Sequence, residues 1–237
     1  ERAYQHARAY ANDRVQGRIA GDKTPDAKPI AWHADVHRML MSMRARIEAM
    51  RCLAYTAAHA LDLATASPDE AQRIHHQARL DFLIPIVKAW CTETSCDIAS
   101  LGVQIHGGMG YIEDTGAAQF LRDARITTIY EGTTGIQAND LIGRKMMRDR
   151  GAAALILLGE VRDVERALSA RNEPAFVALH KSIGRARQAM ETAATWLLET
   201  GARNPAAAGA SAVNLLHLYG LAISGALLAK SALRADD

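Results

Sequence analysis

Aromatic residues, proline and cysteine are all scarce in this chain of 237 residues. Phe, Trp and Tyr together make up 5% of the sequence, and there are 6 prolines. Runs of β-branched residues are short, whereas long stretches are rich in Ala, Leu, Met, Arg and Glu, which favour helices. The composition therefore predicts an all-α fold and argues against a protein built on β-sheets.

The sequence also lacks any block of like charge. It carries 28 Lys and Arg against 26 Asp and Glu, a formal net charge of +2, and the two signs are interleaved. Binding to nucleic acid or anionic lipid requires clustered cations. The longest apolar run, Leu155–Leu158, is far too short to cross a bilayer. We therefore expect neither nucleic acid nor a membrane as a partner.

The cysteines, Cys52, Cys91 and Cys96, are too few and too widely spaced for a disulfide framework or a zinc site. No charged and apolar leader opens the sequence. Both features favour a reducing compartment, and we expect a cytoplasmic protein. His33 and His37 are one helical turn apart, but no third ligand accompanies them, so no metal site is predicted.

Helical spacing of apolar residues already covers the start of the sequence. We expect this first helix to end near Arg14, and we expect the chain to be a fragment of a longer protein. A polar loop follows, and from Pro29 to Leu61 the apolar residues step by three or four, as in a long amphipathic helix of a bundle.

A third helix is predicted to begin at Ser67, where a serine cap precedes Pro68 and the capping-box carboxylate of Glu70. Pro85 removes a backbone donor and should kink this helix. Between residues 102 and 116 several glycines interrupt the helical spacing, and the short apolar stretch 120–126 follows. We therefore expect this region to be the main non-helical part of the chain. Helical spacing resumes over 133–148. Alanine-rich helical segments are expected at about 152–169, 174–200 and 206–235.

The glycine-rich stretch Gln104–Tyr111 follows a helix rather than a strand, so it is not a Rossmann dinucleotide-binding turn. It fits a helix end with glycines in left-handed conformations. The alternative, which the composition favours less, is a backbone that must approach a phosphate or a flavin edge closely. The composition leaves both interpretations open.

The stretch Ile129–Gln137 places Glu131 in a glycine-flanked turn directly before a helix. The carboxylate could simply interact with the positive end of that helix. Alternatively, it is presented at the rim of a pocket, where it could act as a general base. The residues alone do not decide between these two interpretations.

Three segments, Gln104–Tyr111, Leu121–Ile126 and 129–133, resemble in order and spacing the signature of the acyl-CoA dehydrogenases. The similarity extends from residue 1 to about residue 148. The loop 18–29 and residues 33–40 resemble the larger members that carry an extra C-terminal helical region. The resemblance implies an antiparallel four-helix bundle over 1–150, followed by an additional helical region over 151–237.

The resemblance also implies roles for individual residues. Glu131 matches the base that removes the α proton of an acyl-CoA while the β hydride passes to FAD, and its backbone N–H matches one donor to the thioester oxygen. Gly17 and Gly135 depart from the family pattern, which weakens individual FAD contacts. The other matched positions are Tyr130 and Gly132 at the thioester, Arg14 and Gln16 at the FAD pyrophosphate of a neighbouring subunit, Gln104, Gly107 and Gly108 on the adenosine side, and Thr133 at the flavin.

The implied partners are an acyl-CoA substrate, electron-transfer flavoprotein as the acceptor, and further copies of the chain in a homodimer or homotetramer. The family's N-terminal helical domain and β-domain are absent from this sequence, so the chain alone is expected to be inactive. Two alternatives are a helical oligomerisation module and a flavin acyl-CoA oxidase. An assembly module does not need the turn around Glu131, and reactivity with oxygen would identify an oxidase.

Overall fold

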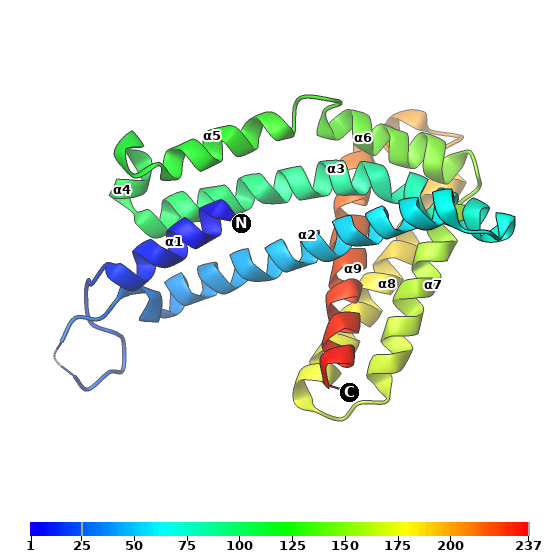
Figure 1. Cartoon of the computed structure of the whole chain (residues 1–237). Helices are drawn as coiled ribbons and strands as arrows, with labels where there is room; N and C mark the ends of the chain where they lie inside the picture. The colour runs from blue at the N-terminus through cyan, green and yellow to red at the C-terminus, as the bar shows by residue number, and fades with distance from the viewer. Residues whose placement is uncertain (25, 237) are drawn as a thin grey trace. The chain divides into compact units, whose positions relative to one another are not determined.

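The computed structural model describes residues 1–24 and 26–236, except for the side chain of residue 236, and this part of the chain contains helices and no strand. The elements follow one another as α1 (Arg2–Asp13), η1 (Ile30–Trp32), α2 (Ala34–Ala66), α3 (Glu70–His106), α4 (Gly108–Tyr111), η2 (Glu113–Thr115), α5 (Ala117–Thr127), α6 (Thr134–Asp140), the π-helix η3 (Leu141–Met147), α7 (Ala152–Ser169), α8 (Pro174–Thr200) and α9 (Pro205–Asp236) (Figure 1).

The helices form two compact units, and neither unit is continuous in the sequence. Unit 1 comprises Glu1–Glu48 and Thr92–Tyr130, and unit 2 comprises Ala49–Cys91 and Glu131–Asp237. The long helices α2 and α3 each contribute one part to both units. The expected division near residue 150 stays a prediction about the complete protein.

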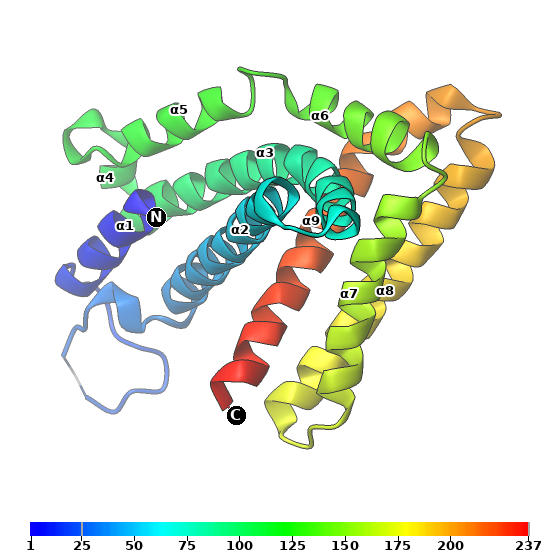
Figure 2. The ribbon, with the colours of Figure 1, turned by 45° about the vertical axis from the view of Figure 1, so that its right-hand side comes forward.

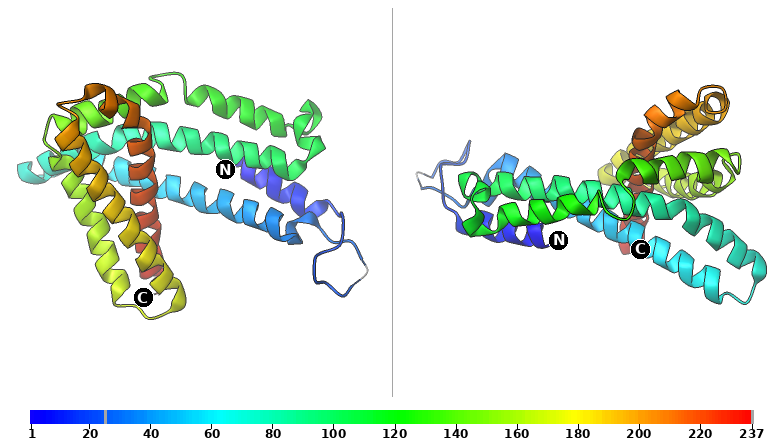
Figure 3. Two further views of the ribbon diagram at one scale, coloured as in Figure 1. Left: turned by 180° about the vertical axis from the view of Figure 1, so that it is seen from behind. Right: turned by 90° about the horizontal axis from the view of Figure 1, so that it is seen from above.

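Unit 1 contains four helical segments that alternate in direction: α1, the first part of α2, the last part of α3, and α5 (Figures 1 and 3). Small and unbranched side chains let these helices approach each other closely, and Ala7, Ala11 and Met43 are fully buried. The all-α fold class with an antiparallel four-helix bundle is thus confirmed.

Unit 2 holds the larger core. Helices α7, α8 and α9 run up and down beside one another (Figure 2), and they pack with α6, η3 and the remaining parts of α2 and α3. At Gly220 of α9, a Cβ atom would lie 2.4 Å from the Trp90 ring of α3, so these two helices meet at a position that only glycine fits. The largest fully buried side chains of this unit are Leu53, Phe82, Leu83, Ile86, Leu141, Met146, Leu157, Leu168, Met190, Leu197 and Tyr219.

Within the described residues, α9 is the one helix that is long and apolar enough to cross a membrane. Its apolar character has another explanation, because Leu216, Tyr219 and Ala222 are almost completely buried in the core of unit 2. Just over half of its most apolar window, 56%, is buried in this way.

Two local predictions were wrong. The apolar stretch 120–126 is helical, because Gly116, with a left-handed φ of 75°, ends the short helix η2 and is followed directly by α5. Helix α3 begins at Glu70 and is capped by Asp69, whose Oδ1 accepts a hydrogen bond from the N–H of Ala71 at 2.9 Å, rather than by Ser67. Helix α3 continues through Pro85, and the expected kink there stays a prediction.

Candidate active site

The turn between α5 and α6 holds Glu131 in a strained conformation. Its φ is 53°, a left-handed value that non-glycine residues rarely adopt, and that of Gly132 is 91°. Such outliers concentrate at functional sites, where the surrounding structure stabilises them. Thr133 then starts α6, with its Oγ1 accepting a hydrogen bond from the N–H of Ile136 at 3.4 Å.

Two side chains from unit 2 hold this turn through its carbonyl groups. The Nζ of Lys88, on α3, donates a hydrogen bond to the oxygen of Gly132. The Nε2 of Gln137, on α6, donates to the oxygen of Glu131 at 3.5 Å. A Cβ atom at residue 132 would lie 2.9 Å from that same Nε2, so it would displace the Gln137 amide, and the left-handed φ of residue 132 independently favours glycine.

These contacts do not involve the carboxylate or the backbone N–H of Glu131. The side chain is exposed, and within the described part of the chain neither its carboxylate nor its backbone N–H has a hydrogen-bond partner. Because Thr133 provides the cap of α6, Glu131 does not serve as a capping carboxylate. The carboxylate and the N–H are therefore both available to a substrate.

Arg14 and Gln16 lie together where the loop after α1 begins. Arg14 donates to the Oε1 of Gln16 from Nη2 at 3.2 Å and from Nε at 3.3 Å. The loop is closed by backbone pairing, with the N–H of Ile30 donating to the oxygen of Arg14 at 2.8 Å. A ring nitrogen of His33 lies 2.9 Å from the oxygen of Gln16. His33 thus contacts the backbone of this loop.

Gln104, Gly107 and Gly108 lie where α3 passes into the short helix α4. Gly107 has a φ of 61°, and a Cβ atom at either glycine would meet nothing within 4 Å. Gly107 therefore follows the end of α3 with a left-handed φ and Gly108 begins α4, while the close approach of this backbone to a phosphate or a flavin stays a prediction. Gly110 is different, because a Cβ there would lie 2.3 Å from the oxygen of Val103.

Stacked rings bring these two segments to the same end of unit 1. The ring of His106, at the end of α3, stacks on Tyr10 of α1 at 4.3 Å and on His6 at 4.6 Å. His106 is buried, and its Nδ1 lies 2.7 Å from the oxygen of Gly102. Burial, and next the adjacent His106, lower the pKa of His6 below its ordinary value. The stacked rings therefore hold α1, which precedes Arg14, against the end of α3, which precedes Gly107.

The sequence analysis missed Lys88 and Gln137, and it missed the stacking of Tyr10 and His6 on His106. Lys88 could have been recognised from the sequence, because it is the one charged residue in the apolar run from Phe82 to Trp90 and must therefore have a polar partner. The other residues could not have been, since nothing local shows that a ring on α1 meets a ring on α3. Glu131 and Gly132 belong to unit 2, whereas Tyr130 and the residues expected around the adenosine belong to unit 1.

The sequence of this chain matches the models of known protein families. The model of the acyl-CoA dehydrogenase C-terminal domain matches residues 1–147, and that of an acetyl-CoA dehydrogenase C-terminal-like region matches residues 157–237. The 3-methylmercaptopropionyl-CoA dehydrogenase of Ruegeria pomeroyi is 48% identical over 236 residues, which covers 100% of this chain and 40% of that protein. The broad-specificity linear acyl-CoA dehydrogenase FadE5 of Mycobacterium tuberculosis is 35% identical over 164 residues, 68% of this chain and 27% of that protein.

Solved structures show the same fold. The Caenorhabditis elegans protein ACDH-11, in complex with C11-CoA, superimposes with a TM-score of 0.73 at 22% identity, covering 99% of this chain and 37% of that one. An acyl-CoA dehydrogenase of Bacillus anthracis complexed with FAD gives a TM-score of 0.69 at 20% identity, covering 99% and 40%. The chain belongs to the acyl-CoA dehydrogenase family, in which it corresponds to the C-terminal helical part. It spans about two fifths of the length of the relative from Ruegeria.

Proposed function

We propose that this chain is the C-terminal part of an FAD-dependent enzyme that oxidises an acyl-CoA thioester to its 2,3-enoyl form, with Glu131 as the base. The observation that carries the proposal is the turn at Glu131. Its strained backbone is held through both carbonyls, while the carboxylate and the N–H remain available. A purely structural turn has no need for an acidic residue at a left-handed position, where glycine is less strained.

The two available groups of Glu131 suit the two demands of the reaction. The α proton of a thioester is weakly acidic, so a base and a polarised carbonyl are both required. The carboxylate would accept the α proton. The backbone N–H would donate to the thioester oxygen, a contact that strengthens as negative charge develops there. Tyr130 and Gly132, on either side, would contact the thioester.

The proposed cofactor residues have the chemistry that FAD requires. FAD, when bound, supplies the acceptor for the hydride from the β carbon. The exposed guanidinium of Arg14, oriented by Gln16, suits a pyrophosphate. Gly107 and Gly108, next to Gln104, leave space for backbone to approach the adenosine side. The hydroxyl of Thr133 uses its oxygen to cap α6, which leaves its proton for a flavin atom.

The proposal is tested in the full-length enzyme with Glu131→Gln. The amide keeps the shape of the side chain and the backbone donor but cannot accept a proton, so FAD content and acyl-CoA binding should be retained. Bleaching of the flavin by acyl-CoA, followed by stopped-flow absorbance, should slow by at least about a hundredfold. Flavin reduction at close to the wild-type rate would place the base elsewhere in the protein.

Further partners follow from the same proposal. We propose electron-transfer flavoprotein as the electron acceptor, a homodimer or homotetramer as the assembly, and the cytoplasm as the location. An assay of the reduced enzyme with electron-transfer flavoprotein and with oxygen separates a dehydrogenase from an oxidase, because rapid reoxidation by oxygen alone would identify the latter. Titrating the enzyme with acyl-CoA esters of different chain lengths, and comparing how far each one bleaches the flavin, identifies the preferred substrate.

A further inference from the structure

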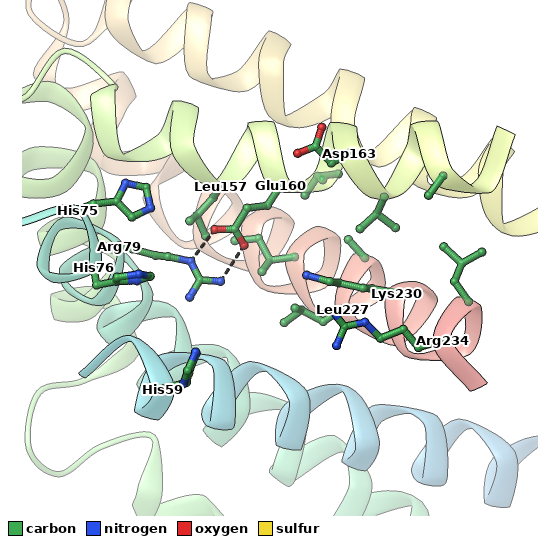
Figure 4. Close-up of a pocket in the computed structure, with 16 residues that line it drawn as sticks. His59, His75, His76, Arg79, Leu157, Glu160, Asp163, Leu227, Lys230 and Arg234 are labelled. Atoms are coloured by element: carbon green, nitrogen blue, oxygen red, sulfur yellow. Dashed lines mark hydrogen bonds and ion pairs between the residues drawn. The ribbon is translucent and has the colours of Figure 1, made fainter. Parts of the chain in front are cut away.

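Unit 2 contains a second candidate site, a pocket of about 500 Å³ that is separate from the turn at Glu131. It lies between α7, α9 and the adjoining ends of α2 and α3 (Figure 4). This volume is within the range of small-molecule sites in proteins, about 300–1,000 Å³. We call it the α7–α9 pocket, and neither Glu131 nor any expected FAD residue lines it.

One wall of the α7–α9 pocket is apolar and the rest is polar. The apolar side chains come from α7 and α9, and none of the lining residues is Phe, Tyr or Trp, so the wall suits an aliphatic chain better than a flat ring. The apolar lining residues are Leu157, Val161, Val164, Ala167, Ile223, Ala226, Leu227 and Leu233.

The charges around the pocket do not balance. The carboxylate of Glu160 receives a bidentate ion pair from the nearly buried Arg79, with Nη2 and Oε2 2.7 Å apart. Asp163 is likewise paired with Arg166 at 3.2 Å. Lys230 and Arg234 remain, one helical turn apart on α9, and they have no ion pair within the described part of the chain. Among the described residues, the pocket therefore has two cations without an ion-pair partner beside an apolar wall.

One of the residues that line this pocket has a buried polar atom without a partner. His76 is half-buried, and its Nδ1 is buried with no hydrogen-bond partner among the described residues. Buried polar atoms are normally paired, so an unpaired one indicates a missing water or ligand. Burial first, and then the nearby His75, Arg79 and His59, lower the pKa of His76. Glu160 acts on that pKa in the opposite direction.

We infer that the α7–α9 pocket binds a fatty carboxylate, with its aliphatic chain along the apolar wall and its carboxylate near Lys230 and Arg234. The apolar area favours the chain through the hydrophobic effect. The pair of cations favours the carboxylate over a neutral head group. This inference goes beyond the proposed function, because it assigns a second ligand to a part of the chain that takes no part in the proposed reaction.

The test is calorimetric titration of the full-length protein with dodecanoate, dodecanol and acetate. Dodecanoate should bind at least about tenfold more tightly than either of the other two, because each of them lacks one half of the recognition. Lys230→Gln combined with Arg234→Gln should weaken dodecanoate binding by about tenfold or more. Lys181→Gln, at an exposed lysine of α8, should leave it unchanged.

A second variant separates binding in this pocket from binding elsewhere. Ala167 is an exposed residue of the lining, so Ala167→Trp fills the pocket without disturbing the core. It should abolish dodecanoate binding while leaving flavin reduction by acyl-CoA unchanged. The inference is overturned if the wild type does not bind dodecanoate. It is also overturned if the Ala167 variant and the Lys230 and Arg234 variant both bind dodecanoate with the affinity of the wild type.

Discussion

Lys88 illustrates how a single side chain can set the geometry of a turn far away in the sequence. It sits on α3 in a run of buried apolar residues, and its ammonium donates to the oxygen of Gly132, 44 positions later. A charged donor in such surroundings is stabilised only by the bonds it makes. We predict that Lys88 is a positioning residue that orients the turn of Glu131 through this hydrogen bond.

Replacing Lys88 with Met in the full-length enzyme should lower kcat by about tenfold or more, because a hydrogen bond to a charged group contributes about 1.5–3 kcal/mol. Met keeps the aliphatic stem, so FAD content and thermal stability should change little. Steady-state kinetics should show the loss in kcat rather than in KM, and Lys88→Arg should restore part of it. Lys181→Met is the matched control. An unchanged kcat for Lys88→Met would show that the contact is incidental.

At the scale of elements, apolar spacing predicted most helices because each one has a buried stripe with a 3.6-residue period. The first helix and the segments after residue 150 were confirmed nearly to the residue. Helix α5 was missed because glycines usually end helices, and Gly116, which does end η2, also directly precedes α5. The pairing of Arg79 with Glu160 spans 81 positions, and no local pattern shows which helices will face each other.

Close contact between α3 and α9 predicts a sharp effect at one glycine. Gly220→Ala would place a methyl group 2.4 Å from the ring of Trp90, which is held in the core of unit 2. We expect a loss of about 1–3 kcal/mol in the free energy of unfolding. The control is Gly209→Ala on the same helix, where a Cβ meets nothing within 4 Å and alanine should stabilise by up to about 1 kcal/mol. Urea unfolding that ranks the two variants equally would contradict this packing.

At the scale of the whole molecule, the expected reaction depends on parts that lie outside this chain or on other copies of it. The chain covers 40% of its relative from Ruegeria, and its two compact units divide the expected cofactor residues between them. Arg14 and Gln16 belong to unit 1, whereas Glu131 and Thr133 belong to unit 2. A family resemblance assigns Arg14 to the FAD of a neighbouring subunit, and this assignment can be tested separately from its role in binding.

Arg14→Ala in the full-length enzyme should lower FAD retention on dilution while leaving helicity and thermal stability unchanged, because Arg14 is exposed and its contacts are local. Arg18→Ala, at an exposed arginine four positions later, is the matched control. Unchanged FAD retention in the Arg14 variant would refute its proposed contact with the cofactor.

Mixed oligomers then show whether Arg14 acts on its own subunit or on a neighbour. In a dimer of one Arg14→Ala chain and one Glu131→Gln chain, a contact across subunits leaves one site with both residues intact, since its base and its arginine come from different chains. Such a dimer should regain about half of the wild-type activity at limiting FAD. If Arg14 instead serves its own subunit, each site lacks one residue and mixing restores nothing. Tagged co-expression and purification of the mixed species, followed by flavin reduction, distinguishes the two outcomes.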